Sequence, residues 1–387
     1  MQQRPRTQWF CLLLVSFLIG GCTWFKQVLP GGNQLPNHDV RLSETVTPLS
    51  YDLLLRLNPS QRKYSGSVKI EVALSKQHGA IDLHAKHLSI SDARFILNQE
   101  TQTLRIDRLD DSFVRLSSQS VLPLGRGVID LTFSGQLSQT PDGLYTVQDG
   151  GQFYIFSQFE PIAARTAFPC FDEPRFKTPF KIAVEIPDEQ LAVSNAPEEK
   201  RVKIESGGTR FVFKPTRPIP TYLVAFGIGP LDVVETDVKL DGTVPFRIVV
   251  PKGKGDKTAF AIRETPSIYE SLKQYLGASY PYQKLDFLAV PNFKAGAMEN
   301  PGLVTYREPL LLVDETKVTP GRLRSIRGVI AHELAHMWFG NSVTLAWWND
   351  IWLNEAFATW MADHVEIALN DQARALRSIA RSKHRVM

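Results

Sequence analysis

Apolar and polar residues alternate in short stretches from about residue 41 to residue 230. The clearest stretch covers residues 67–74, where Val68, Ile70 and Val72 share one face while Lys69 and Glu71 point to the other. A period of two residues is typical of a half-buried β-strand. Similar stretches, separated by turn residues, cover residues 52–57, 128–133, 180–186 and 210–214. This half of the chain is therefore predicted to be mainly antiparallel β-sheet.

The pattern changes after about residue 234, where apolar residues recur at helical spacing. The predicted helices cover residues 258–275, 322–338 and 352–369. The second half is thus expected to be mainly helical around a small sheet. The predicted domains are a signal peptide (1–21), a tether (22–40), a β domain (41–232) and a helical domain (233–387).

The N-terminus has the features of an export signal. Arg4 and Arg6 precede an apolar run that is too short for a membrane span, and Ile19-Gly20-Gly21-Cys22 follows it. This ending resembles a bacterial lipobox, in which the cysteine receives lipid and becomes the mature N-terminus. We expect a lipoprotein anchored through Cys22 to a membrane surface of the bacterial cell envelope. The alternative is an ordinary secretory signal with a chance cysteine.

Composition narrows the class of protein further. The 387 residues carry a formal charge of +4, and basic residues do not interleave with aromatic ones, so nucleic-acid binding has little support. There are 3 cysteines. With Cys11 removed and Cys22 acylated, only Cys170 would remain, so no intrachain disulfide is expected.

Two histidines with metal-ligand spacing lie in the stretch predicted to be helical. His332 and His336 are four residues apart, so their side chains share one helix face and can reach one ion. Glu333 lies beside them and is the residue type that takes a proton from a water activated by zinc. The pattern predicts a zinc site with Glu333 as its catalytic base.

A catalytic zinc ion usually has a third protein ligand, and Glu355 is the candidate. Eighteen residues separate it from His336, enough for the first helix to stop at Gly340-Asn341 and for a second helix to begin near residue 349 or 350. One zinc ion per chain is therefore predicted, held by His332, His336 and Glu355.

Together with the pentapeptide Gly296-Ala297-Met298-Glu299-Asn300, this motif resembles the zinc aminopeptidase family of aminopeptidase N and the leukotriene-hydrolysing aminopeptidase. Further resemblance covers residues 157–160, 168–174 and 221–226. It implies a multidomain fold in which a saddle-like antiparallel β domain precedes a thermolysin-like catalytic domain.

The resemblance also implies which residues bind the substrate. Glu299 would bind the α-amino group of a peptide with a free N-terminus. The neighbouring backbone of Gly296, Ala297 and Met298 would line the substrate, and Gln158 and Glu160 of the β domain would complete the pocket.

The implied function is a metallo-aminopeptidase, and two alternatives remain open. The family adds a tyrosine well beyond the second zinc glutamate, whereas only 32 residues follow Glu355 here. We therefore expect a truncated catalytic domain, with a separate C-terminal fragment as a possible partner. The first alternative is a lipid-anchored protein that binds zinc or peptides with little or no catalysis. The second is an endopeptidase, which would have no evident use for Glu299.

Overall fold

The computed structural model describes residues 41–205 and 207–369, so the predicted signal peptide, Cys22 and the tether lie outside the described residues. Residues Arg41–Val365 form one compact unit, and every contact discussed below lies within it. No helix in the described ranges is both long enough and apolar enough to cross a membrane.

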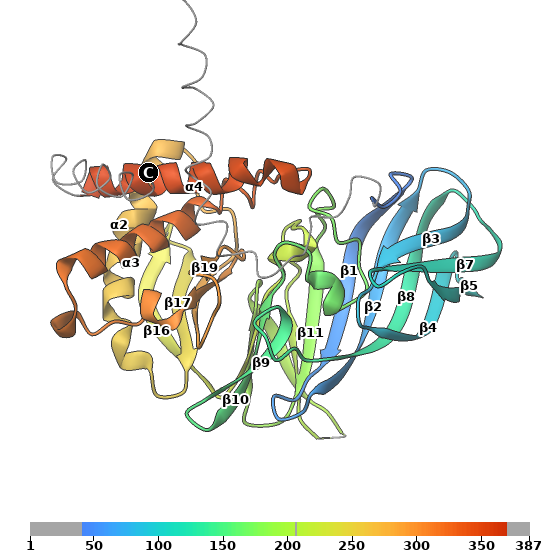
Figure 1. Cartoon of the computed structure of the whole chain (residues 1–387), viewed down its shortest axis with the longest axis horizontal. Coiled ribbons are helices and arrows are strands. Elements are labelled where there is room, and N and C mark those ends of the chain that lie inside the picture. Colours follow the sequence, from blue (N-terminus) through green and yellow to red (C-terminus); the bar gives the residue numbers. More distant parts are fainter. Residues whose placement is uncertain (1–40, 206, 370–387) are drawn as a thin grey trace, which may run out of the picture. The chain divides into compact units, whose positions relative to one another are not determined.

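An eight-stranded sheet dominates the first half of the chain (Figure 1). In spatial order its strands are β13 (Glu198–Lys203), β14 (Thr209–Phe213), β11 (Phe180–Ile186), β1 (Val46–Arg56), β2 (Lys63–Leu74), β8 (Gly125–Gln136), β4 (Ser89–Leu97) and β5 (Glu100–Thr103). All neighbours are antiparallel except β1 and β11, which run parallel, so the expected antiparallel sheet is interrupted by one parallel pair.

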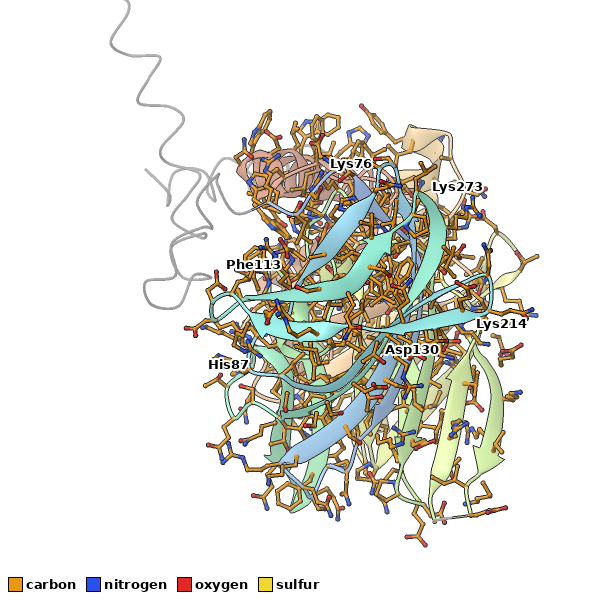
Figure 2. The ribbon with its side chains drawn as sticks, turned by 90° about the vertical axis from the view of Figure 1, so that its right-hand side faces the viewer. Lys76, His87, Phe113, Asp130, Lys214 and Lys273 are labelled. Carbon is orange, nitrogen blue, oxygen red and sulfur yellow. The ribbon has the colours of Figure 1, made fainter. Side chains whose placement is uncertain are left out.

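The alternation seen in the sequence corresponds to the two faces of this sheet. Val68, Ile70 and Val72 of β2 are fully buried. On the other face Lys69 lies opposite Asp130 of β8, with 3.8 Å between Nζ and Oδ2. Figure 2 views this part of the chain with its side chains and labels Asp130. Apolar burial on one face therefore fixes the register, because a slip of one residue would expose the whole apolar set.

Two smaller sheets complete the β-rich half. One contains β3 (His78–His84), β7 (Phe113–Leu122) and β6 (Arg105–Arg108), in that order. The other contains β12 (Leu191–Ser194), β15 (Phe226–Gly229), β10 (Gln152–Gln158) and β9 (Gly143–Asp149). The end of β10 carries Gln158 and leads directly to Glu160, so this sheet delivers two of the predicted site residues.

The described part of the second half contains a five-stranded sheet and three α-helices. The strands, in spatial order, are β16 (Leu231–Leu240), β17 (Val244–Pro251), β18 (Leu285–Val290), β20 (Leu303–Arg307) and β19 (Ala297–Met298). The helices are α2 (Ala259–Leu276), α3 (Pro320–Ala335) and α4 (Ile351–Leu369), and α2 and α3 lie alongside the sheet (Figure 1). The predicted order, a β-rich domain followed by a domain with helices near its C-terminus, is confirmed.

The sheet of this half is more extensive than the sequence pattern suggested. Every residue of β18 is buried, because both of its neighbours run parallel to it and both faces are covered. Apart from Asp286 at its second position, β18 is an apolar run, which has no period of two by which to recognise it. The change from one sheet to the next falls between Gly229 and Leu231. The domain limits given above remain predictions.

Two lysines join the β-rich half to segments of the second half. Lys177 donates from Nζ to the carbonyl oxygens of Asn341 and Ser342, at 2.9 and 2.8 Å. Lys254 pairs with Asp149 at 2.7 Å and with Glu308 at 2.6 Å. Lys177 therefore fixes the loop after α3 to the segment between β10 and β11, and Lys254 fixes the end of β9 to the segments that follow β17 and β20.

A buried ion pair stabilises the segment between β10 and β11. Arg165 and Asp172 are 4% and 2% exposed, with 2.8 Å between Nε and Oδ2. Asp172 also accepts a hydrogen bond from the hydroxyl of Thr221 at 2.6 Å. Removing one partner of a buried pair leaves an uncompensated charge. Breaking this pair should therefore lower the free energy of unfolding more than breaking a surface pair does.

We predict that Asp172→Asn lowers the free energy of unfolding by about 3–5 kcal/mol, because Arg165 stays charged and buried. The matched control is Asp82→Asn, which removes the carboxylate from the exposed Arg115 pair at 2.7 Å and is expected to cost less than about 1 kcal/mol. Urea unfolding measures both. Equal losses in the two variants would contradict the distinction.

Candidate metal centre and substrate site

The two histidines lie at the C-terminal end of α3. His332 is in the last turn, whereas His336 is one residue beyond Ala335, where the helix ends. The backbone N–H of His336 still donates to the carbonyl of His332 at 3.2 Å, which keeps helical spacing between the two side chains. The helix therefore stops before Gly340-Asn341, earlier than predicted. A tight turn through residues 336–340 follows.

The turn depends on a backbone position that only glycine fits. Gly340 has φ +113°, and a Cβ atom there would lie 1.9 Å from Oδ1 of Asn354. The chain can thus reverse while staying in contact with α4. A short 3₁₀-helix, Trp348–Asp350, precedes α4, which begins at Ile351 close to the predicted start.

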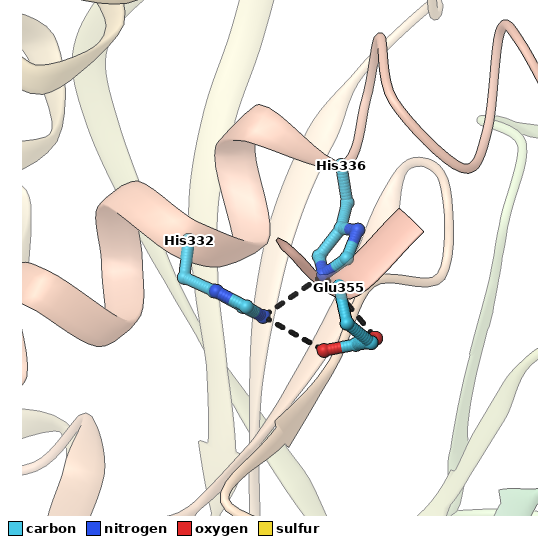
Figure 3. A group of neighbouring side chains, drawn as sticks. All are labelled: His332, His336 and Glu355. Carbon is cyan, nitrogen blue, oxygen red and sulfur yellow. Dashed lines mark hydrogen bonds and ion pairs between the residues drawn. The ribbon is translucent and has the colours of Figure 1, made fainter. Parts of the chain in front are cut away.

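The three predicted zinc ligands converge (Figure 3). Nε2 of His332 lies 2.9 Å from Nε2 of His336, and Oε2 of Glu355 lies 3.4 Å from Nε2 of His332. The third distance, from Nε2 of His336 to Oε1 of Glu355, is 3.7 Å. One face of α3 and the first turn of α4 therefore present two imidazole nitrogens and one carboxylate to one point.

These distances suit a zinc ion. Ligand atoms bound tetrahedrally at about 2.0–2.1 Å from one ion lie about 3.3–3.4 Å from one another. The three observed separations lie on both sides of that value, and the donor set of two imidazoles and a carboxylate is one that zinc uses in catalytic sites. The residues present therefore fit the metal that the motif implies.

Each histidine has a hydrogen-bond partner for its other ring nitrogen. Nδ1 of His336 lies 2.6 Å from Oδ1 of Asn354 and 3.1 Å from the carbonyl of Phe339. Nδ1 of His332 lies 3.3 Å from the hydroxyl of Thr359. Such contacts orient metal-binding imidazoles. Asn354 and Thr359 were not predicted as members of the site. No local pattern marked them, because α4 also carries other polar residues such as Asp363 and His364.

Glu333 is buried beside the triad. It is 5% exposed, and its Oε2 has no hydrogen-bond partner among the described residues. Burial raises the pKa of Glu333 well above its usual value, and the charges of Glu299, Glu355 and Glu160 raise it further. A carboxylate in this setting is a stronger proton acceptor than one in water.

Glu299 follows β19 and is held at both ends. It is 3% exposed, its Oε1 accepts from Nδ2 of Asn354 at 2.9 Å, and its backbone carbonyl accepts from Nδ2 of Asn341 at 2.7 Å. Its carboxylate groups with Glu333 and His336, and separately with Glu160 and Glu355. Glu299 therefore lies between the metal ligands and the residue contributed by the β-rich half.

Glu160 and Gln158 reach the same site from the end of β10. Nε2 of Gln158 lies 3.4 Å from Sδ of Met298, which joins the two halves of the chain at the pentapeptide. Burial raises the pKa of Glu160, and the charges of Glu299 and Glu355 add to the effect. Ala297 and Met298 pair only with β20, so β19 is an edge strand, and Gly296 precedes it.

The site as a whole is strongly anionic. Burial opposes ionisation of Glu355, but the charges of His336 and His332 outweigh it and lower the pKa of Glu355 to about 2. Burial likewise opposes the charged form of His336, yet the neighbouring Glu299 and Glu355 raise its pKa overall. Four glutamates thus surround two histidines, an arrangement that favours cationic ligands.

Comparison with known proteins shows which family this chain resembles. Residues 47–223 match the peptidase M1 N-terminal domain, and residues 260–386 match the peptidase family M1 domain. Aminopeptidase M1 of Arabidopsis thaliana is 40% identical over 337 residues, covering 83% of this chain and 37% of that protein. Endoplasmic reticulum aminopeptidase 1 of Homo sapiens is 36% identical over 358 residues, covering 88% of this chain and 38% of that protein.

The chain therefore belongs to peptidase family M1, as the sequence motifs indicated. It spans less than two fifths of the length of these two relatives.

Proposed function

We propose that this chain carries the zinc-binding and N-terminus-binding groups of a metallo-aminopeptidase that removes N-terminal residues from peptides. The observation that supports this most is the convergence of the histidine and glutamate triad with Glu299 and Glu333 in one buried cluster. A metallopeptidase needs the metal-binding triad, and selection for a free N-terminus needs a carboxylate such as Glu299.

In this proposal His332, His336 and Glu355 hold the zinc ion. When bound, zinc supplies positive charge that polarises the peptide carbonyl and acidifies the attacking water. Glu333 accepts the proton of that water at Oε2, which is free of protein partners among the described residues, and later returns it to the leaving amine.

Glu299 and Glu160 bind the substrate's ammonium group. Both carboxylates lie in the group that also contains Glu355, one of the metal ligands. A free N-terminus bound there would leave room for only one residue between the ammonium group and the metal. The unpaired edge of β19 offers backbone groups to which an extended peptide can add as a strand. Gln158 and Met298 lie beside this path and would contact the substrate's first side chain.

The main alternative is a binding protein with little or no catalysis. Three aromatic side chains of α4 are exposed, which favours a partner that covers them. They are Trp352, Phe357 and Trp360, with exposed fractions of 58%, 40% and 49%. A separate C-terminal fragment is one such partner, and it stays a prediction.

An endopeptidase is disfavoured because Glu299 and Glu160 would oppose the neutral backbone of an internal peptide segment.

We predict that Glu333→Gln binds zinc and peptide with unchanged affinity while kcat falls about 10²–10⁴-fold, because the amide cannot accept the water's proton. Glu299→Ala is expected to raise KM and to weaken the preference for a free over an N-acetylated aminoacyl substrate. Steady-state kinetics on both substrates measures these effects.

A preference that survives Glu299→Ala, or full activity of Glu333→Gln, would contradict the mechanism. A wild-type chain that binds zinc and peptide without turnover would instead support the binding-protein alternative.

We further propose that Cys22 is acylated and anchors the mature protein to a membrane of the bacterial cell envelope. The support is the charged start, the short apolar run and the lipobox-like sequence alone. Labelled palmitate added to cells that express the chain should enter the wild type and not Cys22→Ser. Equal incorporation in both would exclude this anchor.

A further inference from the structure

Asn354 joins the metal centre to the candidate amine-binding group through one side chain. It is 3% exposed, and its amide lies between His336 and Glu299. Nδ2 donates to Oε1 of Glu299 at 2.9 Å, and Oδ1 lies 2.6 Å from Nδ1 of His336. No other side chain in the described ranges forms hydrogen bonds to both residues, since Asn341 reaches only the backbone of Glu299.

The chemistry of the three groups allows one orientation of this amide. Asn354 presents its NH₂ group to Glu299, whose Oε1 accepts the hydrogen bond. Its oxygen then faces His336, and because an amide oxygen only accepts, Nδ1 of His336 must carry the hydrogen. The carbonyl of Phe339, 3.1 Å from the same nitrogen, also only accepts and requires the same tautomer.

The consequence lies at the other ring nitrogen. In a neutral imidazole with hydrogen on Nδ1, the lone pair is on Nε2, which is the atom that faces His332 and Glu355. We propose that Asn354 is a positioning residue whose side-chain oxygen, oriented by the hydrogen bond from Nδ2 to the carboxylate of Glu299, fixes the metal-binding tautomer of His336. Zinc affinity and recognition of the substrate's amine then share one hydrogen-bonded element. The part of this inference that concerns the substrate's amine rests on the proposed function.

The surrounding backbone is built around this amide. Because Gly340 has no Cβ atom, its backbone can lie close to Oδ1 of Asn354. A Cβ atom at this position would lie only 1.9 Å from that oxygen. Asn341, the next residue, holds the backbone carbonyl of Glu299. The turn after α3 therefore both seats the amide oxygen and fixes the residue that receives the amide NH₂ group.

The test measures zinc affinity by competition with a chromophoric chelator, which needs no peptidase activity. Asn354→Ala removes both contacts and should weaken zinc binding about 10–100-fold. Asn354→Asp keeps an oxygen acceptor for His336 but cannot donate to Glu299, so zinc affinity should stay within about threefold of wild type. The same variant should raise KM for a substrate with a free N-terminus.

The matched control is Asn195→Ala. Asn195 is also a buried asparagine with hydrogen bonds at both ends, donating to the carbonyls of Leu223 and Pro301 and accepting from the N–H of Ala225. Its loss should destabilise the fold without changing zinc affinity. Equal zinc affinity in Asn354→Ala and Asn195→Ala would overturn the proposal, as would an equally large loss in Asn354→Asp and Asn354→Ala.

A second readout covers a variant that fails to fold. Nitrogen-15 NMR of the zinc-free wild-type chain, at a pH where His336 is neutral, should show a protonated Nδ1 and an unprotonated Nε2. The opposite tautomer would overturn the proposal whether or not the chain is an active peptidase. Absence of zinc binding with the expected tautomer would reject the proposed function and leave the positioning role of Asn354 intact.

Discussion

The mutual repulsion of four glutamates that the fold brings together is the constraint that the rest of the site has to offset. Glu160, Glu299, Glu333 and Glu355 come from a strand end, an edge strand and two helices, and the two histidines compensate only part of their charge. Burial and mutual repulsion raise the pKa of Glu160 and Glu333. A divalent ion and a substrate ammonium would supply the missing positive charge. The same arrangement would therefore account for both the metal binding and the selection of a free N-terminus that we propose.

Backbone geometry makes this concentration of charge possible. The turn after α3 uses the left-handed conformation of Gly340 to bring α4 against the histidines, and Lys177 holds the carbonyls of the following two residues. Asn354 and Asn341 then supply the hydrogen bonds that Glu299 needs once it is removed from water. Positive charges, glycine and amides thus stabilise a cluster that burial of carboxylates alone would oppose.

Local patterns in the sequence predicted what depends on neighbouring residues. The period of two in β2 and the four-residue spacing of His332 and His336 each reflect the geometry of one element, and both are present in the structure. The predicted ligands and Glu299 also lie together. The fully buried β18 and the parallel pairing of β1 with β11 depend on distant chain segments, so no local pattern indicated them. Asn354 was equally hidden, because its role arises from partners on two other elements.

The most direct test of the account is X-ray absorption spectroscopy at the zinc edge, on the full chain loaded with one equivalent of zinc. The account predicts two imidazole nitrogens and at least one oxygen at about 2.0–2.1 Å, without sulfur. The spectrum should lose one imidazole in His336→Ala. A sulfur ligand at about 2.3 Å, which Cys170 could supply only by unfolding its buried site, would contradict the account. So would a spectrum that is the same in wild type and His336→Ala.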